Sequence, residues 1–299
     1  MKAYYNILAL LILTSTVGVT VNAQKLDVGL LLGGAYYYGD VVNELEPTTM
    51  RAAVGGFLRY RLGTRFAIKA YGGFNKVSGD DQLSESEWQK QRNWTFETNI
   101  LEGSLLLEWN LIEDRNRGRR FANPFIPYLF GGVGMFNFTP KSDFNGQLQS
   151  LAPLQLSGVA YTLNAICVPF GFGARYYVAR KFQIGFELGV RYTNTSYIDD
   201  IAPDNVYQDP SSTPFPTLTE YYYARSSANR NPGDLRSKMG SNVKEVAGSN
   251  GLNQFLGASD FYLTTGLTAS YTIGEAKGGS AGGSRGRNYG KSIRCPRFY

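Results

Sequence analysis

The sequence predicts an all-β protein: an eight-stranded antiparallel transmembrane β-barrel of the outer-membrane type, with long extracellular loops and a periplasmic C-terminal tail. Three observations lead to this fold class. The chain opens with the pattern of an export signal, eight later segments alternate between apolar and polar residues, and no later segment is apolar for the ~18 residues that a transmembrane helix needs. Because only helices and closed barrels satisfy every backbone N–H and C=O group in lipid, the chain is expected to span a membrane as a closed sheet.

Residues 1–23 have the pattern of a secretory signal peptide. Lys2 precedes an apolar run at residues 7–13, and a Val-Asn-Ala site at residues 21–23 stands before Gln24. A membrane-anchoring helix is the alternative, but the run is shorter than the ~20 residues of a spanning helix and is followed by polar residues 14–16. We therefore expect cleavage after Ala23, a barrel over residues 24–274 and a basic periplasmic tail over residues 275–299.

The strands are indicated by alternation with a period of two, which a barrel requires because successive side chains face lipid and lumen. In residues 54–62 the even positions carry the apolar set, whereas Arg59 and Arg61 are odd. Residues 66–75 repeat the pattern after a short turn, with Phe66 and Ile68 on one face and Lys69 on the other. The remaining strands are expected at residues 26–38, 101–110, 125–138, 166–178, 182–193 and 261–273. Residues 125–138 are apolar on both faces, so their register stays open.

The charged minority face predicts what fills the barrel. Seven charged residues fall on the expected inward face: Arg59, Lys69, Glu102, Glu108, Arg175, Glu187 and Arg191. The lumen of an eight-stranded barrel is packed with side chains, and buried charges of both signs must pair. We expect a structural salt-bridge network, with a proton path or a channel as the alternative.

A soluble eight-stranded barrel is the alternative architecture. Such a barrel would turn its oily face inward and its polar face outward. The export signal, the charged minority face and aromatic strand ends such as Tyr36, Trp109 and Tyr192 favour lipid outside.

The connections fall into two populations. Long loops are expected outside, near residues 40–50, 78–94, 139–161 and 195–259, and short turns inside, near residues 62–65, 113–124 and 179–181. An even strand count places both termini on the periplasmic side. The turns are basic, through Arg65, Arg115, Arg117, Arg119, Arg120, Arg180 and Lys181. The loops are acidic, through Asp40, Glu44, Glu46, Asp80, Asp81, Asp199, Asp200, Asp204 and Asp209. This asymmetry points to an acidic partner beneath the membrane.

Residue types restrict the possible chemistry. Histidine is absent, which excludes Ser-His and Cys-His nucleophilic arrangements and histidine-ligated metal sites. Two acidic pairs, at residues 80–81 and 199–200, could serve an acid-base or calcium role, but loop acids are more often solvated turn formers. We expect no enzyme activity, no cofactor, no metal and no nucleic-acid partner.

Two segments carry a resemblance to a known family. Residues 185–192 read GFELGVRY and residues 193–200 read TNTSYIDD, which resembles the strand and loop start of the PorG family. The ending Arg294-Cys295-Pro296-Arg297-Phe298-Tyr299 is similar to the Cys-Pro-containing terminus of those proteins. The Tyr-x-Asp-Asp exit is shared by several small Bacteroidota barrels, the Cys-Pro ending narrows the match, and the Gly- and Arg-rich stretch 275–294 departs from it.

The resemblance implies a component of the type IX secretion system that ties the outer membrane to a periplasmic ring of PorK- and PorN-like proteins. Such a barrel anchors or organises the machine and passes no cargo. The predicted partner-binding residues are Cys295, Arg294, Arg297, Arg115, Arg117, Arg119 and Arg120. An adhesin or passive barrel that binds through its outside loops is the alternative.

Cys295 is expected to form a disulfide with a periplasmic partner, because exposed thiols of exported proteins rarely stay free. Its only possible internal partner, Cys167, is placed by parity on the inward face of a strand. A periplasmic tail would have to thread the packed lumen to reach it. A free thiol is the alternative.

Overall fold

The computed structural model describes residues 26–39, 41–42, 47–84, 90, 93–115, 123–156, 160–201 and 260–273. The expected signal peptide and tail lie outside these residues. The described chain forms nine strands and three short 3-10 helices. The strands are β1 (Leu26–Tyr38), β2 (Arg51–Arg61), β3 (Phe66–Asp80), β4 (Thr95–Asn110), β5 (Phe125–Phe144), β6 (Gln147–Ser150), β7 (Asn164–Tyr177), β8 (Phe182–Thr193) and β9 (Phe261–Ile273). The 3-10 helices are η2 (Pro47–Thr49), η3 (Asp81–Leu83) and η4 (Ala152–Leu154).

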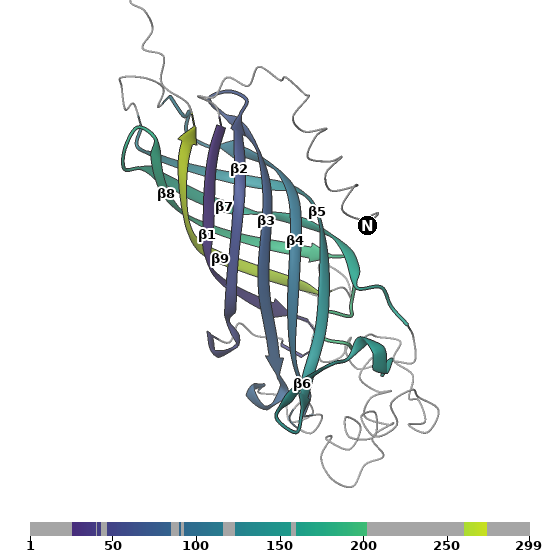
Figure 1. The fold of residues 1–299 in the computed structure, drawn as a ribbon. Helices are drawn as coiled ribbons and strands as arrows, with labels where there is room; N and C mark the ends of the chain where they lie inside the picture. Colours follow the sequence, from purple (N-terminus) through teal and green to yellow (C-terminus); the bar gives the residue numbers. More distant parts are fainter. Residues whose placement is uncertain are drawn as a thin grey trace, which may run out of the picture.

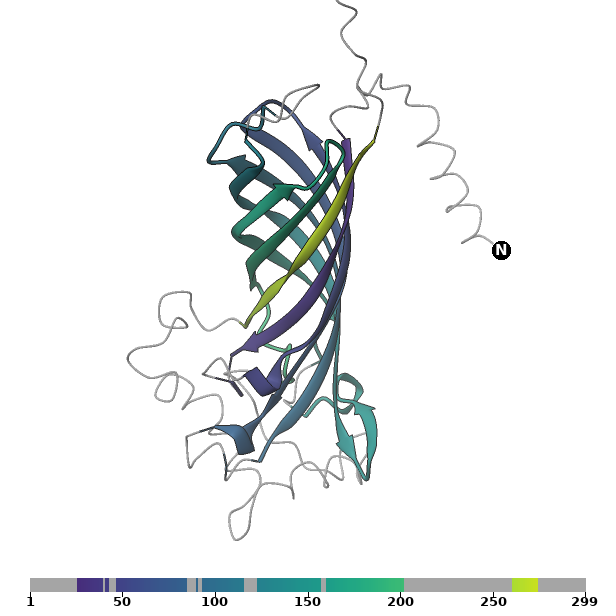
Figure 2. The same ribbon diagram turned by 90° about the vertical axis from the view of Figure 1, so that its left-hand side faces the viewer.

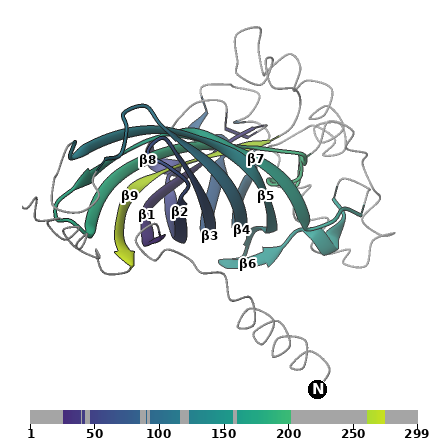
Figure 3. The same ribbon diagram turned by 90° about the horizontal axis from the view of Figure 1, so that it is seen from above.

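Eight of the strands close into a barrel. The order β4-β3-β2-β1-β9-β8-β7-β5 runs around the wall, and an additional pairing of β4 with β5 joins its two ends (Figure 1). All of these pairings are antiparallel. Seen from above, the strands follow one another around a common axis (Figure 3). The predicted all-β, eight-stranded antiparallel barrel is therefore confirmed, and β6 pairs only with β5, outside the ring.

The two faces of the wall have opposite polarity, as the alternation predicts. Leu101 and Leu267 point outward with 63% and 70% of their surface exposed, whereas Lys69 and Glu108 are fully buried inside. Apolar outward positions recur on all eight wall strands. A surface of this kind belongs in lipid, and closure leaves no strand edge of the wall unpaired there. The architecture is that of an outer-membrane β-barrel. Among the described residues, no helix is long and apolar enough to cross a membrane.

The register of β5, which the sequence left open, is now defined. Tyr128, Phe130, Phe136 and Phe138 point inward, and Met135 points outward. The inward positions of β5 carry aromatic rings where other strands carry charged side chains. These rings fill the lumen between the charged groups. Both faces are apolar for different reasons, one to face lipid and one to pack.

The expected loop boundaries need correction. Strand β3 continues to Asp80 and β4 begins at Thr95, so both extend beyond the predicted ends. The predicted loop at residues 139–161 contains the end of β5 and a hairpin to β6, which projects beyond the end of the barrel (Figure 2). Its turn is Asn145-Gly146, with φ of 52° and 82°, the left-handed pair that tight hairpins favour.

Connections at the two ends of the barrel differ in length. We call one end the turn end, where residues 62–65, 111–124 and 178–181 join neighbouring strands. We call the other the loop end, where β1 is followed by β2, β3 by β4, β5 and β6 by β7, and β8 by β9. Because Leu26 pairs with Ile273, the first and last described residues meet at the turn end.

Candidate functional site

Glu108 on β4 is the centre of a buried charge network in the half of the lumen nearer the turn end. Its Oε2 accepts hydrogen bonds from Arg59 Nε at 2.7 Å and from Arg175 Nη1 at 3.1 Å. The Nζ of Lys69 lies 3.5 Å from its Oε1. Three strands, β2, β3 and β7, thus each supply one cation to a single carboxylate.

Lys69 extends the network to β8. Its Nζ lies 2.6 Å from Glu187 Oε2, which also accepts a hydrogen bond from the Tyr128 hydroxyl at 2.8 Å. The same ammonium lies 5.2 Å from the ring centre of Phe57 and 5.1 Å from that of Phe130. Aromatic faces attract cations, so the rings both fill the space and stabilise the charge.

A second group of charges closes the turn end. Arg61 Nη2 lies 2.5 Å from Asp27 Oδ1, which also accepts from the Thr272 hydroxyl at 2.7 Å. Asp114, in the connection after β4, accepts from the Tyr177 hydroxyl at 2.7 Å and is buried. The described start of this connection therefore reaches into the mouth of the barrel.

Glu102 lies in the middle of the lumen and links several strands there. It lies 3.3 Å from Arg191 Nε and accepts from the Ser104 hydroxyl at 2.5 Å, from Asn75 Nδ2 at 3.2 Å and from the Tyr262 hydroxyl at 3.1 Å. Strands β3, β4, β8 and β9 are bridged by this one side chain.

The lumen charges balance in the described part of the chain between the turn end and Glu102. Five cations and five anions lie there: Arg59, Arg61, Lys69, Arg175 and Arg191 with Asp27, Glu102, Glu108, Asp114 and Glu187. Burying an unpaired charge is costly, so paired charges and rings fill the space that an open pore would need. The arrangement suits a rigid scaffold.

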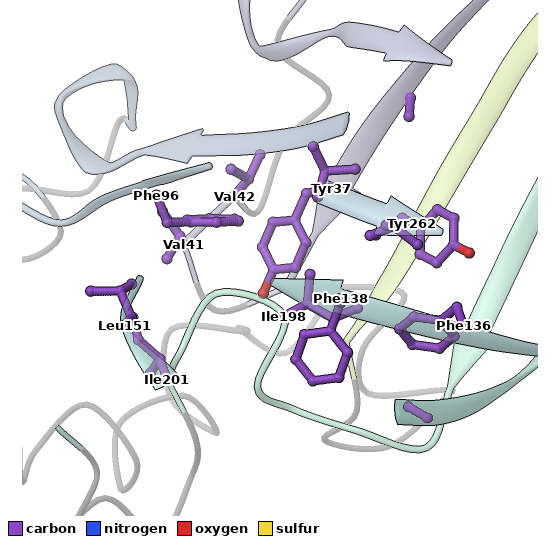
Figure 4. Close-up of a cluster of buried hydrophobic side chains, with 14 of the residues drawn as sticks. Tyr37, Val41, Val42, Phe96, Phe136, Phe138, Leu151, Ile198, Ile201 and Tyr262 are labelled. Carbon is purple, nitrogen blue, oxygen red and sulfur yellow. The ribbon is translucent and has the colours of Figure 1, made fainter. Parts of the chain in front are cut away.

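A hydrophobic plug closes the loop end. Ile198 and Ile201, from the segment that follows β8, are fully buried among Tyr37, Phe96 and Phe138 (Figure 4). The segment is fastened through its backbone: the Thr98 hydroxyl donates to Ile198 C=O at 2.6 Å, and Trp94 Nε1 donates to Asp199 C=O at 3.1 Å. We call residues 194–201 the plug segment.

Three of the four acids in these loop pairs are buried, which corrects the expectation of solvated turn formers for them, whereas half-buried Asp80 accepts from Gln82 N–H at 2.9 Å as a turn former does. Asp81, Asp199 and Asp200 are buried. Asp199 Oδ1 accepts from Ile201 N–H at 2.9 Å, and Asp81 Oδ2 accepts from Trp94 N–H at 2.8 Å. Asp200 Oδ1 accepts from the Tyr161 hydroxyl at 2.7 Å. These carboxylates organise the plug by satisfying backbone and hydroxyl donors.

The surface of the turn end is basic. Glu113 lies 3.2 Å from Arg65 Nη2 and 2.5 Å from Arg115 Nη2. The hydrogen bond and charge of Arg115, with those of Arg65, hold the pKa of the Glu113 carboxyl below its usual value. In the β7–β8 turn, Arg180 is exposed and Lys181 half-buried.

The structure brings all seven predicted lumen residues together inside the barrel: Arg59, Lys69, Glu102, Glu108, Arg175, Glu187 and Arg191. Of the predicted partner-binding residues, Arg115 is exposed at the turn end. The other six lie outside the described residues: Arg117, Arg119, Arg120, Arg294, Cys295 and Arg297. Cys167 is buried in the wall with a free thiol.

Several residues of the network were missed from the sequence. Asp27 and Arg61 had the necessary signal, since each lies on the inward parity of its strand. Asp114 lies in a connection, where alternation has no meaning, so no local pattern could have placed it in the lumen.

In the part of the chain that the structure describes, no group of three His, Cys, Asp or Glu side chains is arranged to hold a metal ion.

Comparisons with known proteins give one family match. The model of a family described as "Domain of unknown function (DUF6089)" matches residues 4–218. No curated protein matches the sequence.

Solved structures with a likeness to the chain are small bacterial barrels. The outer membrane protein OprG from Pseudomonas aeruginosa is 10% identical, with a TM-score of 0.39 over 84% of this chain and 98% of that one. The N-terminal β-barrel domain of Pseudomonas aeruginosa OprF is 11% identical, with a TM-score of 0.33 over 82% and 96%. Ail, the attachment invasion locus protein of Yersinia pestis, is 10% identical, with a TM-score of 0.34 over 83% and 97%.

Proposed function

The chain belongs to the DUF6089 family, and we propose that it is an outer-membrane barrel that anchors or organises the periplasmic ring of a type IX protein secretion machine. In this proposal it is PorG-like, its ring partners are PorK- and PorN-like proteins, and it binds them through its basic turns and C-terminal tail. It catalyses no reaction.

The observation that carries the proposal is a filled barrel with a basic turn end. Because paired charges and the plug occupy the lumen, we place the function at the ends of the barrel. Among the described residues of the turn end, Glu113 is the one acid that is not buried, and the cations Arg65, Arg115, Arg180 and Lys181 outnumber it. A surface of this charge suits an acidic partner.

Orientation is part of the proposal. In outer-membrane barrels the short turns are periplasmic and the long loops extracellular, which puts the turn end and both chain ends on the side of the ring. The resemblance of residues 185–200 to the PorG family supports the same assignment. In the structure these residues form most of β8, with Glu187 and Arg191 in the lumen, and continue into the plug segment.

Affinity purification from native membranes tests the proposal. Wild type should recover ring proteins, and recovery should fall as salt rises, because exposed charges act within a Debye length of roughly 8 Å at physiological salt. Charge reversal at Arg117, Arg119 and Arg120 should release the partner while heat-modifiable gel mobility shows a folded barrel. Charge reversal at Arg51, exposed at the loop end, is the matched control and should leave recovery unchanged. Equal recovery from all variants would reject the basic turns as the contact.

The proposed covalent contact is tested separately. Non-reducing gels of native membranes should show a larger species that collapses on reduction, disappears in Cys295→Ser and persists in Cys167→Ser. Migration of wild type as a monomer, with ring proteins still recovered, removes the disulfide and keeps the anchor.

An adhesin is the second candidate, favoured by the hairpin of β5 and β6. It projects from the loop end and carries an exposed apolar residue, Leu148. Recovery of host ligands instead of ring proteins, lost when β6 is deleted, would support this function.

A further inference from the structure

An aromatic girdle encircles most of the turn end. Six of the eight wall strands each place one exposed ring there, at the first residue of the strand or near its last: Phe66, Trp109, Phe125, Tyr176, Phe182 and Tyr271. Three pairs are direct neighbours across strands, Phe66 with Trp109, Phe125 with Tyr176 and Phe182 with Tyr271. Such girdles lie at the level of lipid headgroups.

Two turns place a cation immediately beyond this girdle. Arg65 precedes Phe66, and Lys181 precedes Phe182. Their surroundings differ, however. Arg65 is paired with Glu113, whereas neither Arg180 nor Lys181 forms an ion pair with a carboxylate of the described residues. Within the part of the chain that the structure describes, the β7–β8 turn therefore presents two positive charges without an ion-pair partner at headgroup level.

Lys181 is directed along the outside of the wall. Its Nζ lies 5.9 Å from the ring centre of Tyr271, which belongs to the neighbouring strand and faces outward. The turn itself is fixed: the N–H groups of Val178 and Ala179 both donate to Phe182 C=O at 3.1 Å, and Thr272 N–H donates to Lys181 C=O at 2.8 Å. The ammonium is thus held beside a phenol on the surface that contacts lipid.

We propose that Arg180, Lys181 and Tyr271 form a binding site for the phosphate group of an anionic phospholipid. The ammonium supplies a point charge, the guanidinium offers paired donors, and the phenol hydroxyl is a further donor. The position in the girdle selects a phosphate that is attached to acyl chains, because the chains pack against the outward rings. This site does not depend on the proposed secretion partner.

The test measures lipid selectivity. The folded barrel is reconstituted in nanodiscs of equal phosphatidylcholine and phosphatidylglycerol, released, and analysed by native mass spectrometry for retained lipid. Wild type should retain phosphatidylglycerol preferentially. The double variant Arg180→Gln, Lys181→Gln should lose that preference, by roughly fivefold for each charge removed. An unchanged preference for phosphatidylglycerol in this variant would overturn the site.

Matched variants separate the site from general charge effects. Arg65→Gln removes a cation from the same end that is already paired, so it should change selectivity much less than either Gln substitution in the β7–β8 turn. Lys181→Arg keeps the charge and should keep the preference, and the single variant Lys181→Gln, which should lose part of it, serves if the double variant fails to fold. An equal loss in Arg65→Gln would overturn the proposal.

Two further arms identify the ligand. Excess inorganic phosphate should leave the bound phosphatidylglycerol in place, because it lacks acyl chains. Complete displacement by inorganic phosphate would overturn the assignment to lipid. Wild type could instead show no lipid selectivity and bind an acidic protein through Arg180 and Lys181. That result would assign the two residues to protein binding and would also overturn the lipid site.

Discussion

At the scale of single residues, stability depends on how each buried charge is compensated. Glu108 receives three cations, and Lys69 is shared between Glu108 and Glu187. In such a network the removal of one member leaves its partner as an unpaired, desolvated charge. This lowers the free energy of unfolding by far more than the intact pair contributes to it. Exposed ion pairs of the same protein can lose one member at little cost, because water solvates the remaining charge.

Lys69→Met should therefore lower the free energy of unfolding by about 3–5 kcal/mol. Lys76 offers the matched control, because its Nζ lies 2.6 Å from Glu97, as close as Lys69 lies to Glu187, but the two side chains are 35% and 22% exposed. Lys76→Met should cost less than about 1 kcal/mol. Urea titration of the barrel in lipid vesicles measures both, and equal costs would contradict the network.

Glu113 gives a prediction about pH. Its pKa is lowered by Arg115 and Arg65, so the stabilising contribution of this carboxylate is present above the ordinary glutamate value and is lost as pH falls through the lowered value. Arg115→Gln should raise the pKa of Glu113 toward that ordinary value, and Arg180→Gln should not. Carbon-detected NMR titration of the Glu113 carboxyl checks this, and an unchanged midpoint in Arg115→Gln would show that the ion pair does not persist in solution.

At the scale of elements, the plug segment behaves as part of the core although it follows a strand end. Asp260 fastens it from the other side, since Oδ2 accepts from Ile198 N–H at 3.0 Å and the Thr193 hydroxyl donates to Asp260 C=O at 2.6 Å. The segment before the long connection and the residue after it are therefore tied to each other.

Ile198→Ala should release the plug segment without opening the wall. The lost packing is worth about 2–5 kcal/mol, and hydrogen exchange should speed up at residues 198–201 while β1 to β5 stay protected. Ile184→Ala, on the outward face of β8, is the control and should leave exchange of the segment unchanged. Uniform acceleration over all strands would mean that the segment is required for the barrel itself.

Sequence reasoning was accurate for elements and weaker for their ends, for a physical reason. Alternation records the environment of each wall residue, so Arg59 and Glu187 could be placed inside without any structure. It fails for Asp199, because burial of a loop carboxylate depends on donors from distant elements. The hairpin at Asn145-Gly146 was detectable from its turn residues. The strand ends were not, because a strand that continues beyond the membrane has no lipid-facing side to impose an apolar alternation.

At the scale of the whole molecule, the barrel separates two chemically different ends by a filled lumen. The eight-stranded wall returns the chain to the end where it started, since Leu26 and Ile273 are neighbours. The first and last described residues therefore lie at the turn end, and the proposed orientation places this end on the periplasmic side.

Protease added to intact cells should cut within residues 195–259 and leave a tag after Tyr299 intact. The reason is the even strand count, combined with the outward placement of long loops. Permeabilised cells provide the control, in which the tag should also be cut. Cleavage of the tag in intact cells would reverse the proposed orientation.

The seam between β1 and β9 has a consequence for biosynthesis. It joins the first described strand to the last: the Thr272 hydroxyl donates to Asp27 across 245 positions of sequence. Closing so long a loop is entropically costly and slow. Until β9 has paired, β1 and β8 each present an unpaired edge, and exposed edges are templates for pairing with other chains. A copy that is still folding must therefore be kept apart from its neighbours until its last strand closes the ring.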